Sequence, residues 1–311
     1  MCNNTNLHRA RATKNDEFYT RYEDIAKELA NYTRQFAGKV VYCNCDDPFT
    51  SRFFQYFQVH FKELKLKKLI TSCYENTFNK GESPKALWSV FDGEHPLKIY
   101  ELAGDGDFRS EECVRILKRA DIVVSNPPFS LFRDYVNLLL QHNKKFLIVG
   151  PMNAVMYRNI FPQFKSGEMS FGLNPLKRFT VPAGAEVDGK GDPKTGEVLF
   201  GNIRWFTNLD TSRRYDIFST GKRFSPSAYP CYENYQAVEV GKVRNIPDDY
   251  SGIMGVPLTF FESFNPEQFE VLGADESNGT GLSCGLWESG TDRHPLIDGQ
   301  RKFKRVFIRR W

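Results

Sequence analysis

The sequence predicts an α/β fold in which a doubly wound, mostly parallel sheet is followed by a C-terminal region of a different character. Three observations lead to this prediction. Short β-branched runs alternate with helical patterns across residues 39–150. One such run, Ile122 to Val124, ends abruptly at Asn126-Pro127-Pro128-Phe129, where the prolines prevent its continuation. After about Asp210 the periodicity weakens, and aromatic, basic, glycine and proline residues are mixed.

Composition sets limits on the kind of protein. A length of 311 residues with 41% hydrophobic and 14% aromatic residues is enough for a substantial core. The balance of 42 Lys and Arg against 38 Asp and Glu gives +4, too small by itself to indicate a polyanionic partner. Because the sequence has no long apolar run and no apolar signal core, we expect a cytoplasmic protein without a membrane partner. The seven cysteines lack the paired spacing of a zinc site, so we expect reduced thiols and no metal.

The first elements are a helix and half of a nucleotide-binding βαβ unit. Acidic residues and spaced apolar residues from Asp16 onward predict a helix that ends at Gly38. A strand from Lys39 to Cys45 follows, and the turn Asp46-Asp47-Pro48 leads into an aromatic-rich helix over about 49–61. The turn lacks the glycine pattern that cradles a pyrophosphate, which argues against a dinucleotide ligand.

The alternation of strands and helices continues beyond this unit. Strands are predicted at 66–73, 98–102 and 145–149, with a less regular segment between the first two, and helices through Leu117 and at 131–141. Strands separated by helices join through right-handed crossovers, so these residues predict a mostly parallel sheet. A helix at 152–164 and an antiparallel hairpin of 178–182 with 198–207 are expected to follow, the hairpin closing the sheet.

The tetrad Asn126-Pro127-Pro128-Phe129 suits a site that alkylates an amine. It follows a buried strand, and ligands of open α/β sheets bind at the carboxyl ends of the strands. Fixed φ angles at the prolines orient the Pro127 carbonyl, so that this oxygen and the Asn126 amide oxygen can converge on one NH2 group. Phe129 can stack on a base that carries the amine. The alternative is a proline-terminated strand with an asparagine turn and no chemistry.

Basic residues gather near both ends of the sequence. Residues 1–15 carry Arg9, Arg11 and Lys14 before any acid, a pattern that favours a solvated tail. The segment 301–311 places cations beside aromatic residues in a strand-like pattern that suits a nucleic-acid surface. We expect Arg301, Lys304 and Arg309 to contact phosphates, and a basic edge strand protected from aggregation is the alternative.

Longer strings of residues extend this interpretation beyond the tetrad. They are Asp16-Glu-Phe-Tyr-Thr20, Val40-Val-Tyr-Cys-Asn-Cys-Asp-Asp-Pro48, Gly104-Asp-Gly-Asp-Phe-Arg-Ser110, Ser125-Asn-Pro-Pro-Phe-Ser-Leu-Phe132, Gly150-Pro-Met-Asn153 and Gly201-Asn-Ile-Arg-Trp-Phe206. In this order they resemble the EcoRI-type family of adenine-specific DNA methyltransferases, and the resemblance covers most of residues 10–270. The Asp-Asp-Pro turn stands where most methyltransferases have a glycine-rich turn, a variant typical of the EcoRI type.

The resemblance implies the methyltransferase version of the doubly wound sheet, S-adenosylmethionine as methyl donor and the N6 amine of an adenine in double-stranded DNA as acceptor. By position it implies a cofactor site formed by Asp16, Phe18, Tyr19, Thr20, Asn44, Cys45, Asp46, Asp47, Pro48, Asp107 and Phe108. The last two would hold the adenine of the cofactor. The catalytic tetrad Asn126, Pro127, Pro128 and Phe129 would hold the target base, which must flip out of the duplex. Glu75 is a candidate partner for the cofactor ribose, and a surface acid is the alternative there.

The sequence therefore predicts a basic arm at 1–15, a catalytic domain at 16–209 and a target-recognition and DNA-binding region at 210–311. The expected enzyme is a modification methyltransferase of a restriction-modification system or a solitary methylase. It would pair functionally with an endonuclease without a direct protein partner. Two alternatives stay open, a methyltransferase acting on RNA or a protein amide and a non-catalytic DNA-binding relative. The basic C-terminal region argues against a protein substrate, and the intact tetrad argues against loss of catalysis.

Overall fold

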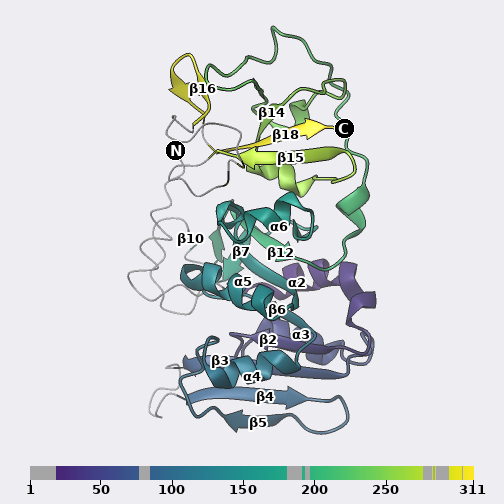
Figure 1. Ribbon diagram of the computed structural model, residues 1–311. Helices are drawn as coiled ribbons and strands as arrows, with labels where there is room; N and C mark the ends of the chain where they lie inside the picture. Colours follow the sequence, from purple (N-terminus) through teal and green to yellow (C-terminus); the bar gives the residue numbers. More distant parts are fainter. Residues whose placement is uncertain are drawn as a thin grey trace. The chain divides into compact units, whose positions relative to one another are not determined.

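The computed structural model in Figure 1 describes residues 19–76, 85–180, 191–192, 197–275, 282, 284, 294–302 and 304–311. The chain forms two compact units. Unit 1 consists of Met1–Pro151 with Gly172–Leu209, and unit 2 consists of Met152–Phe171 with Asp210–Trp311. The segment 152–171, which the sequence places with the catalytic domain, is therefore grouped with unit 2. None of the helices in the described ranges combines the length and the apolar character that crossing a membrane requires.

A large sheet forms the framework of unit 1. Its strands are β2 (Val40–Asn44), β3 (Lys68–Asn76), β4 (Lys85–Phe91), β5 (Lys98–Glu101), β6 (Ile122–Ser125), β7 (Lys145–Pro151) and β12 (Ile203–Thr207). Within the unit they follow the order β5-β4-β3-β2-β6-β7-β12. β2 pairs parallel with β3 and β6, and β6 pairs parallel with β7. The outer strands β4 and β5 on one side and β12 on the other pair antiparallel, so the predicted parallel sheet forms the centre.

Helices cover both faces of this sheet, as expected for a doubly wound fold. They are α2 (Tyr22–Leu29), α3 (Arg52–Val59), α4 (Glu111–Arg119) and α5 (Phe132–Gln141), with the 3-10 turns η1 (Ala30–Phe36) and η2 (Phe129–Leu131). Val41, Val124 and Leu147 share one buried cluster with aromatic residues of α3. Tyr42 and Val123 alternate with them and are also fully buried. In Figure 1 α4 and α5 lie on the near side of the sheet.

One strand of the sheet departs from the sequence prediction. The segment expected to be irregular contributes β4, which lies between β3 and β5 and pairs antiparallel with both. Its Trp88 ring stacks on Tyr100 of β5 with ring centroids 4.8 Å apart. The apolar run of residues 86–91 is short and flanked by Pro84 and Gly93. Because proline and glycine are typical of turns, the sequence pattern did not indicate a strand here.

The predicted hairpin closing the sheet is also different. Residues 198–207 form two strands instead of one, and Gly201 lies between them. The first part, β11 (Glu197–Leu199), pairs with β9 (Arg178–Thr180) in a small sheet with β10 (Gly191–Asp192) and β1 (Tyr19–Thr20). The second part is β12, which pairs with β7. Because Tyr19 and Thr20 pair with β9 as β1, the first helix of the described residues begins at Tyr22.

Buried Glu28 connects α2 by hydrogen bonds to residues 173 and 174, which belong to the second part of unit 1. Its carboxylate accepts hydrogen bonds from the Tyr32 hydroxyl (2.8 Å) and the Leu173 backbone N–H (2.8 Å). It also accepts from the backbone and side-chain N–H groups of Asn174, at 2.7 and 2.9 Å. A Cβ atom at Gly172 would lie 2.3 Å from this carboxylate, so the residue there must be glycine.

Unit 2 is built on a smaller sheet with the order β13-β14-β18-β15. These strands are β13 (Val238–Glu239), β14 (Met254–Pro257), β15 (Phe269–Ala274) and β18 (Arg305–Arg310), and β18 lies in the segment 301–311 that the sequence predicts to be strand-like. Its other elements are η3 (Met152–Met156), α6 (Phe161–Lys165), β8 (Ser170–Phe171), η4 (Ser212–Tyr215), η5 (Val243–Asn245), η6 (Leu258–Glu262), β16 (Leu296–Ile297) and β17 (Gln300–Arg301). The helix predicted at 152–164 is thus two short elements, η3 and α6, separated by a turn.

Candidate active site

The loop after β2 carries a buried carboxylate at the carboxyl edge of the sheet. Cys45 adopts φ +66°, which turns the chain sharply after β2. Asp46 is only 8% exposed, and its two oxygens accept hydrogen bonds from Ser51 Oγ (2.6 Å) and Ser125 Oγ (2.9 Å). Ser125 ends β6, and its hydroxyl also contacts the Asn44 carbonyl. These contacts fasten the loop of β2 to the strand that precedes the tetrad.

Asp47 and Ser51 organise the entry into α3. The Asp47 carboxylate accepts from the backbone N–H groups of Phe49 (2.8 Å) and Thr50 (3.0 Å), an Asx turn. Ser51 is the N-cap of α3 and accepts from the Phe54 N–H at 3.1 Å. Side chains therefore hold this turn in place of the glycine-rich backbone that is usual in nucleotide-binding βαβ units.

Asn44 and its neighbours form the ends of β2 and β3. The Asn44 side chain is 1% exposed, and its amide oxygen lies 3.3 Å from Ser72 Oγ, which in turn contacts the Tyr42 hydroxyl at 2.5 Å. Its amide nitrogen is buried and has no acceptor among the described residues. A buried donor without an acceptor is costly in a folded protein, so this nitrogen suits a bound ligand oxygen.

The segment 104–108 follows β5 and returns to the same edge of the sheet. Gly106 has φ +81°, and a Cβ atom there would lie 2.2 Å from the Cys73 carbonyl of β3, so only glycine fits. Asp107 forms a hydrogen-bonded ion pair with Arg109 at 2.6 Å, which lowers the pKa of the carboxyl group. The Phe108 ring is buried and packs edge-on against Tyr135 of α5, with centroids 5.0 Å apart.

The tetrad occupies the turn between β6 and α5. Asn126 is half-buried, Pro127 is buried, and Pro128 has φ −56° and leads into η2. Phe129 is 7% exposed and belongs to the buried cluster that also contains Val41, Val124 and Leu147. Asn126 is the residue after Ser125, whose hydroxyl group holds the loop that contains Asp46. The ends of β2, β3 and β6 bring the Asn44–Pro48 turn and the tetrad to one edge.

Comparison with known proteins decides the family. The chain matches the family described as "Adenine-specific methyltransferase EcoRI" over residues 6–311. It is 43% identical to the Type II methyltransferase M.EcoRI of Escherichia coli over 88% of this chain and 91% of that protein. The chain belongs to the EcoRI-type adenine-specific methyltransferases. It is also 42% identical to M.MpnI of Mycoplasma pneumoniae over 86% of this chain and 84% of the relative, and 41% identical to M.MgeORF184P of Mycoplasma genitalium over 86% and 85%.

The chain is thus an adenine-specific DNA methyltransferase, and the resemblance stated from its motifs is confirmed. Not every predicted site residue of this methyltransferase falls where the structure describes it. Asp16 and Phe18 lie outside the described residues. Tyr19 and Thr20 form β1, and Thr20 lines a cavity of about 370 Å³ with Arg21, Tyr22, Glu23, Arg52, Gln55 and Thr180. The side chain of Glu75 also lies outside the described part.

Sequence reasoning missed several residues that organise the methyltransferase site. Ser51 and Ser125 hold Asp46, but small polar residues next to a motif carry no distinctive signal of their own. Tyr135 lies fully buried on α5 against Phe108, and burial raises the pKa of its phenol well above the usual value. Helical periodicity could identify Tyr135 only as a core position.

The predicted phosphate-binding residues of the methyltransferase lie in unit 2. Arg301 is exposed on β17. Lys304 is half-buried, and burial lowers the pKa of its amine. Arg309 pairs with Glu270 across β18 and β15, with Nη2 2.5 Å from Oε2. A phosphate would therefore have to displace Glu270 from Arg309 and reach the half-buried amine of Lys304.

Proposed function

We propose that this methyltransferase transfers a methyl group from S-adenosylmethionine to the N6 amine of an adenine flipped out of double-stranded DNA. The observation that carries the proposal is the contact of Ser125 with Asp46 and Asn44, because it joins the proposed cofactor loop to the tetrad. Membership of the family supports the reaction, and this contact supports its place in the structure.

The residues at the carboxyl edge fit the proposed donor. The buried amide nitrogen of Asn44 offers a donor to a carboxylate or ribose oxygen of the cofactor. Phe108 provides an apolar surface, and Asp107, held by Arg109, provides an acceptor for an exocyclic amine of the cofactor adenine. The cofactor supplies an electrophilic methyl group. Asp46 faces Ser51 and Ser125, so its proposed role is to position the loop and not to contact the ligand directly.

The tetrad acts on the target amine by positioning. The Asn126 amide oxygen and the Pro127 carbonyl accept the two amine hydrogens and favour a nucleophilic geometry at nitrogen. Alignment of the nitrogen with the methyl group contributes several kcal/mol, and no strong base is needed because the methylated amine is acidic enough to release a proton to water. Flipping the base costs a few kcal/mol, which stacking on Phe129 and phosphate contacts offset.

We assign target recognition to the region 210–311 and a DNA-contacting role to Arg301, Lys304 and Arg309. This region carries no chemistry of its own and is rich in cations and aromatic residues. The basic arm at 1–15, with Arg9, Arg11 and Lys14, lies outside the described residues. A Type II modification enzyme acts on the DNA of its own cell, so we expect a cytoplasmic location and functional pairing with an endonuclease of the same specificity.

Substitution of Asn126 tests the proposed mechanism. Asn126→Ala removes one acceptor and should lower single-turnover methyl transfer by about 10²-fold or more, while cofactor and DNA binding change little. Asn126→Asp keeps an acceptor oxygen at the same position and should retain more activity than the alanine variant. The measurement is transfer of labelled methyl to plasmid DNA with enzyme in excess. A rate for Asn126→Ala within a few-fold of the parent would remove Asn126 from the mechanism.

A further inference from the structure

We propose that two hydrogen-bonded segments of unit 2, residues 216–224 and 242–249, form a DNA-binding surface, hereafter the clamped surface. Lys222, Arg223, Lys242 and Arg244 would contact phosphates, and Ile217 would contact an apolar edge in a groove. The inference rests on the proposed function, because it assumes that duplex DNA is the substrate. It assigns a location and individual residues to binding that the sequence placed only in a broad region.

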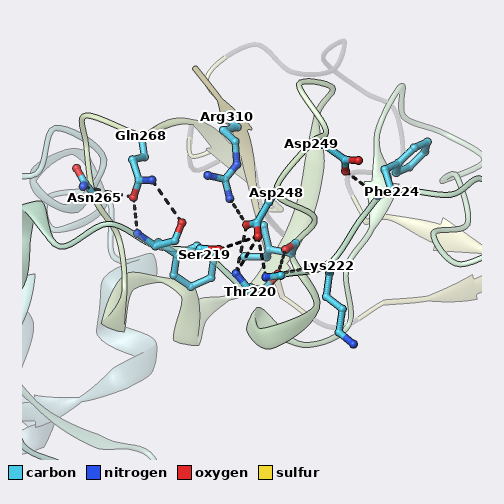
Figure 2. Close-up of polar contacts among 12 residues, drawn as sticks. Ser219, Thr220, Lys222, Phe224, Asp248, Asp249, Asn265, Gln268 and Arg310 are labelled. Atoms are coloured by element: carbon cyan, nitrogen blue, oxygen red, sulfur yellow. Dashed lines mark hydrogen bonds and ion pairs between the residues drawn. The ribbon is translucent and has the colours of Figure 1, made fainter.

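The segment 216–224 has no regular secondary structure, yet side chains hold almost every residue of it. The Asp248 carboxylate accepts from Ser219 Oγ (2.8 Å) and from the backbone N–H groups of Thr220 (3.2 Å) and Gly221 (2.7 Å). Arg310 of β18 donates to the same carboxylate at 3.0 Å. Figure 2 shows these contacts converging on Asp248. The segment is therefore anchored to the sheet of unit 2.

Further contacts fix both ends of the segment. Gln268 accepts from the Phe218 N–H at 2.6 Å and donates to the Phe218 carbonyl at 3.3 Å. At the other end Asp249 accepts from the Phe224 N–H at 2.7 Å, and the Phe224 ring stacks on Tyr250 with centroids 4.1 Å apart. A surface that is ordered before binding loses less conformational entropy when the ligand arrives.

The second segment is joined directly to the first. Thr220 Oγ1 donates to the Ile246 carbonyl at 2.6 Å, and the Asp248 N–H donates to the Lys222 carbonyl at 2.8 Å. Lys242 and Arg244 lie on or beside η5, just before this junction. The cations of the two segments are consequently held on neighbouring stretches of chain whose relative placement is fixed by hydrogen bonds.

The acids and the cations of this surface differ in how they are engaged. Asp248 is partly buried in the contacts just described, Asp249 is exposed but accepts from the Phe224 N–H, and Asp216 is the remaining acid of the two segments and is also exposed. The four cations Lys222, Arg223, Lys242 and Arg244 are exposed and form no ion pair with a described residue. Figure 2 shows the Lys222 side chain extending away from the Asp248 contacts. Exposed cations on a fixed backbone are the arrangement that phosphate binding requires.

The C-terminal cations contrast with these four. Arg305 pairs with Glu239 at 2.6 Å, Arg309 with Glu270 at 2.5 Å and Arg310 with Asp248 at 3.0 Å. A phosphate would have to compete with a carboxylate for each of them. The four cations of the clamped surface form no ion pair with a described residue, so we expect them to provide more of the counterion release on DNA binding than Arg305, Arg309 and Arg310 do.

Ile217 adds an apolar contact to the clamped surface. Its side chain is 84% exposed, although the residues on either side are fixed, Phe218 by Gln268 and the Asp216 carbonyl by Asn265 at 3.1 Å. This side chain therefore presents apolar area on a fixed backbone, which a partner can cover. In the major groove of DNA the methyl group of thymine offers an apolar partner.

The test compares two variants with the same change in charge. One replaces Lys222, Arg223, Lys242 and Arg244 by Gln. The control replaces Lys39, Lys62, Lys67 and Lys68, which are exposed in unit 1 and of which Lys39, Lys67 and Lys68 lie at the amino ends of β2 and β3, opposite the tetrad. Binding of a duplex fragment from a plasmid that the parent methylates is measured from low to high salt. The thermal unfolding midpoint of each variant is recorded.

Neutralising the clamped surface should reduce the slope of log affinity against log salt by about 0.9 for each phosphate that the variant no longer neutralises, roughly 3.6 for the four cations. The control should keep the slope of the parent. Ile217→Ser should leave the slope unchanged. It should reduce the ratio of affinities for the fragment that the parent methylates and for a duplex of scrambled sequence by roughly tenfold, because it removes an interaction with a base. Ile217→Leu should retain most of this preference. An unchanged slope in the fourfold clamped-surface variant, with a native unfolding midpoint, overturns the inference.

These outcomes are separate from those of the proposed function. If the fourfold variant binds like the parent while the parent methylates DNA and Asn126→Ala does not, the reaction stands and the binding surface lies elsewhere. If the parent transfers no methyl group to DNA, the proposed function fails whatever the salt dependence.

Discussion

Replacing Ser125 with Ala tests how the cofactor loop is coupled to the tetrad. The hydroxyl group contacts the Asn44 carbonyl and donates to Asp46 Oδ2 at 2.9 Å, and all three groups are buried. Removing it deprives a buried carboxylate and a buried carbonyl of a donor, which costs about 1–3 kcal/mol. Because Asn126 is the next residue, we expect this cost to appear as misplacement of its amide oxygen.

The expected result is a fall in the single-turnover rate of methyl transfer of roughly 5- to 150-fold, the factor that corresponds to about 1–3 kcal/mol. The affinity for duplex DNA should not change. The assay mixes enzyme in excess with labelled S-adenosylmethionine and plasmid DNA, and stops the reaction at short times. Affinity for the cofactor is measured separately by calorimetry.

Ser51→Ala serves as the comparison, because Ser51 is the other donor to Asp46. It removes the 2.6 Å hydrogen bond to Asp46 and the N-cap of α3, but it leaves β6 and the tetrad untouched. We expect this variant to lose cofactor affinity and about 1 kcal/mol of stability, with a smaller change in the rate of transfer at saturating cofactor. The reasoning is refuted if Ser125→Ala transfers methyl groups within twofold of the parent rate.

Three other predictions concern stacking, pH and the fold. Phe129→Ala should weaken extrusion of a fluorescent base analogue by about 1–3 kcal/mol, and Phe129→Tyr should retain it; equal extrusion in both would assign stacking to another aromatic residue. Burial raises the pKa of Asp275 to about 6, so the folded chain holds a proton that the unfolded chain releases between about pH 4 and pH 6. Stability from this group therefore falls as pH rises through that window, and Asp275→Asn, which can still accept from Arg305, should flatten the dependence of the urea midpoint on pH. Glu28→Ala should cost about 1–3 kcal/mol for each buried donor that it leaves without an acceptor. It should lower the unfolding midpoint far more than Glu23→Ala on the exposed side of α2 does; equal midpoints would show that the carboxylate is not needed.

The parallel centre of the sheet could be predicted because its strands are continuous apolar runs ending at polar turns. Val41 to Cys43 and Ile122 to Val124 are buried on both faces, and such strands need no alternation to be recognised. The edges were harder to predict. β4 is an antiparallel strand that lies between turn residues. The break at Gly201 divides 197–207 between two sheets, because β11 pairs with β9 and β12 pairs with β7, and no local pattern specifies these partners.

The candidate site divides in the same way. Asn126, Pro127 and the Asp46-Asp47-Pro48 turn stand in strings long enough to be distinctive, so the sequence could place them at the carboxyl edge. The direction of the Asp46 carboxylate, toward Ser51 and Ser125, depends on contacts between β2, α3 and β6 that no local pattern encodes. The pairing of Arg309 with Glu270 likewise follows from the register of β15 and β18, which are far apart in sequence.

The carboxylate of Glu28 also bears on how the chain is made. It lies in the first helix of unit 1, but the N–H groups that satisfy it belong to Leu173 and Asn174, beyond the segment 152–171 that goes to unit 2. At roughly 5–20 residues per second, a ribosome needs several seconds to add the chain between the end of β7 and the end of β12. Until then the nascent sheet lacks an edge strand, and the Glu28 charge lacks the backbone donors that make its burial tolerable. We therefore expect a nascent chain ending at Pro151 to remain accessible to chaperones and proteases, and the enzyme to acquire protection only when Gly172–Leu209 has left the exit tunnel.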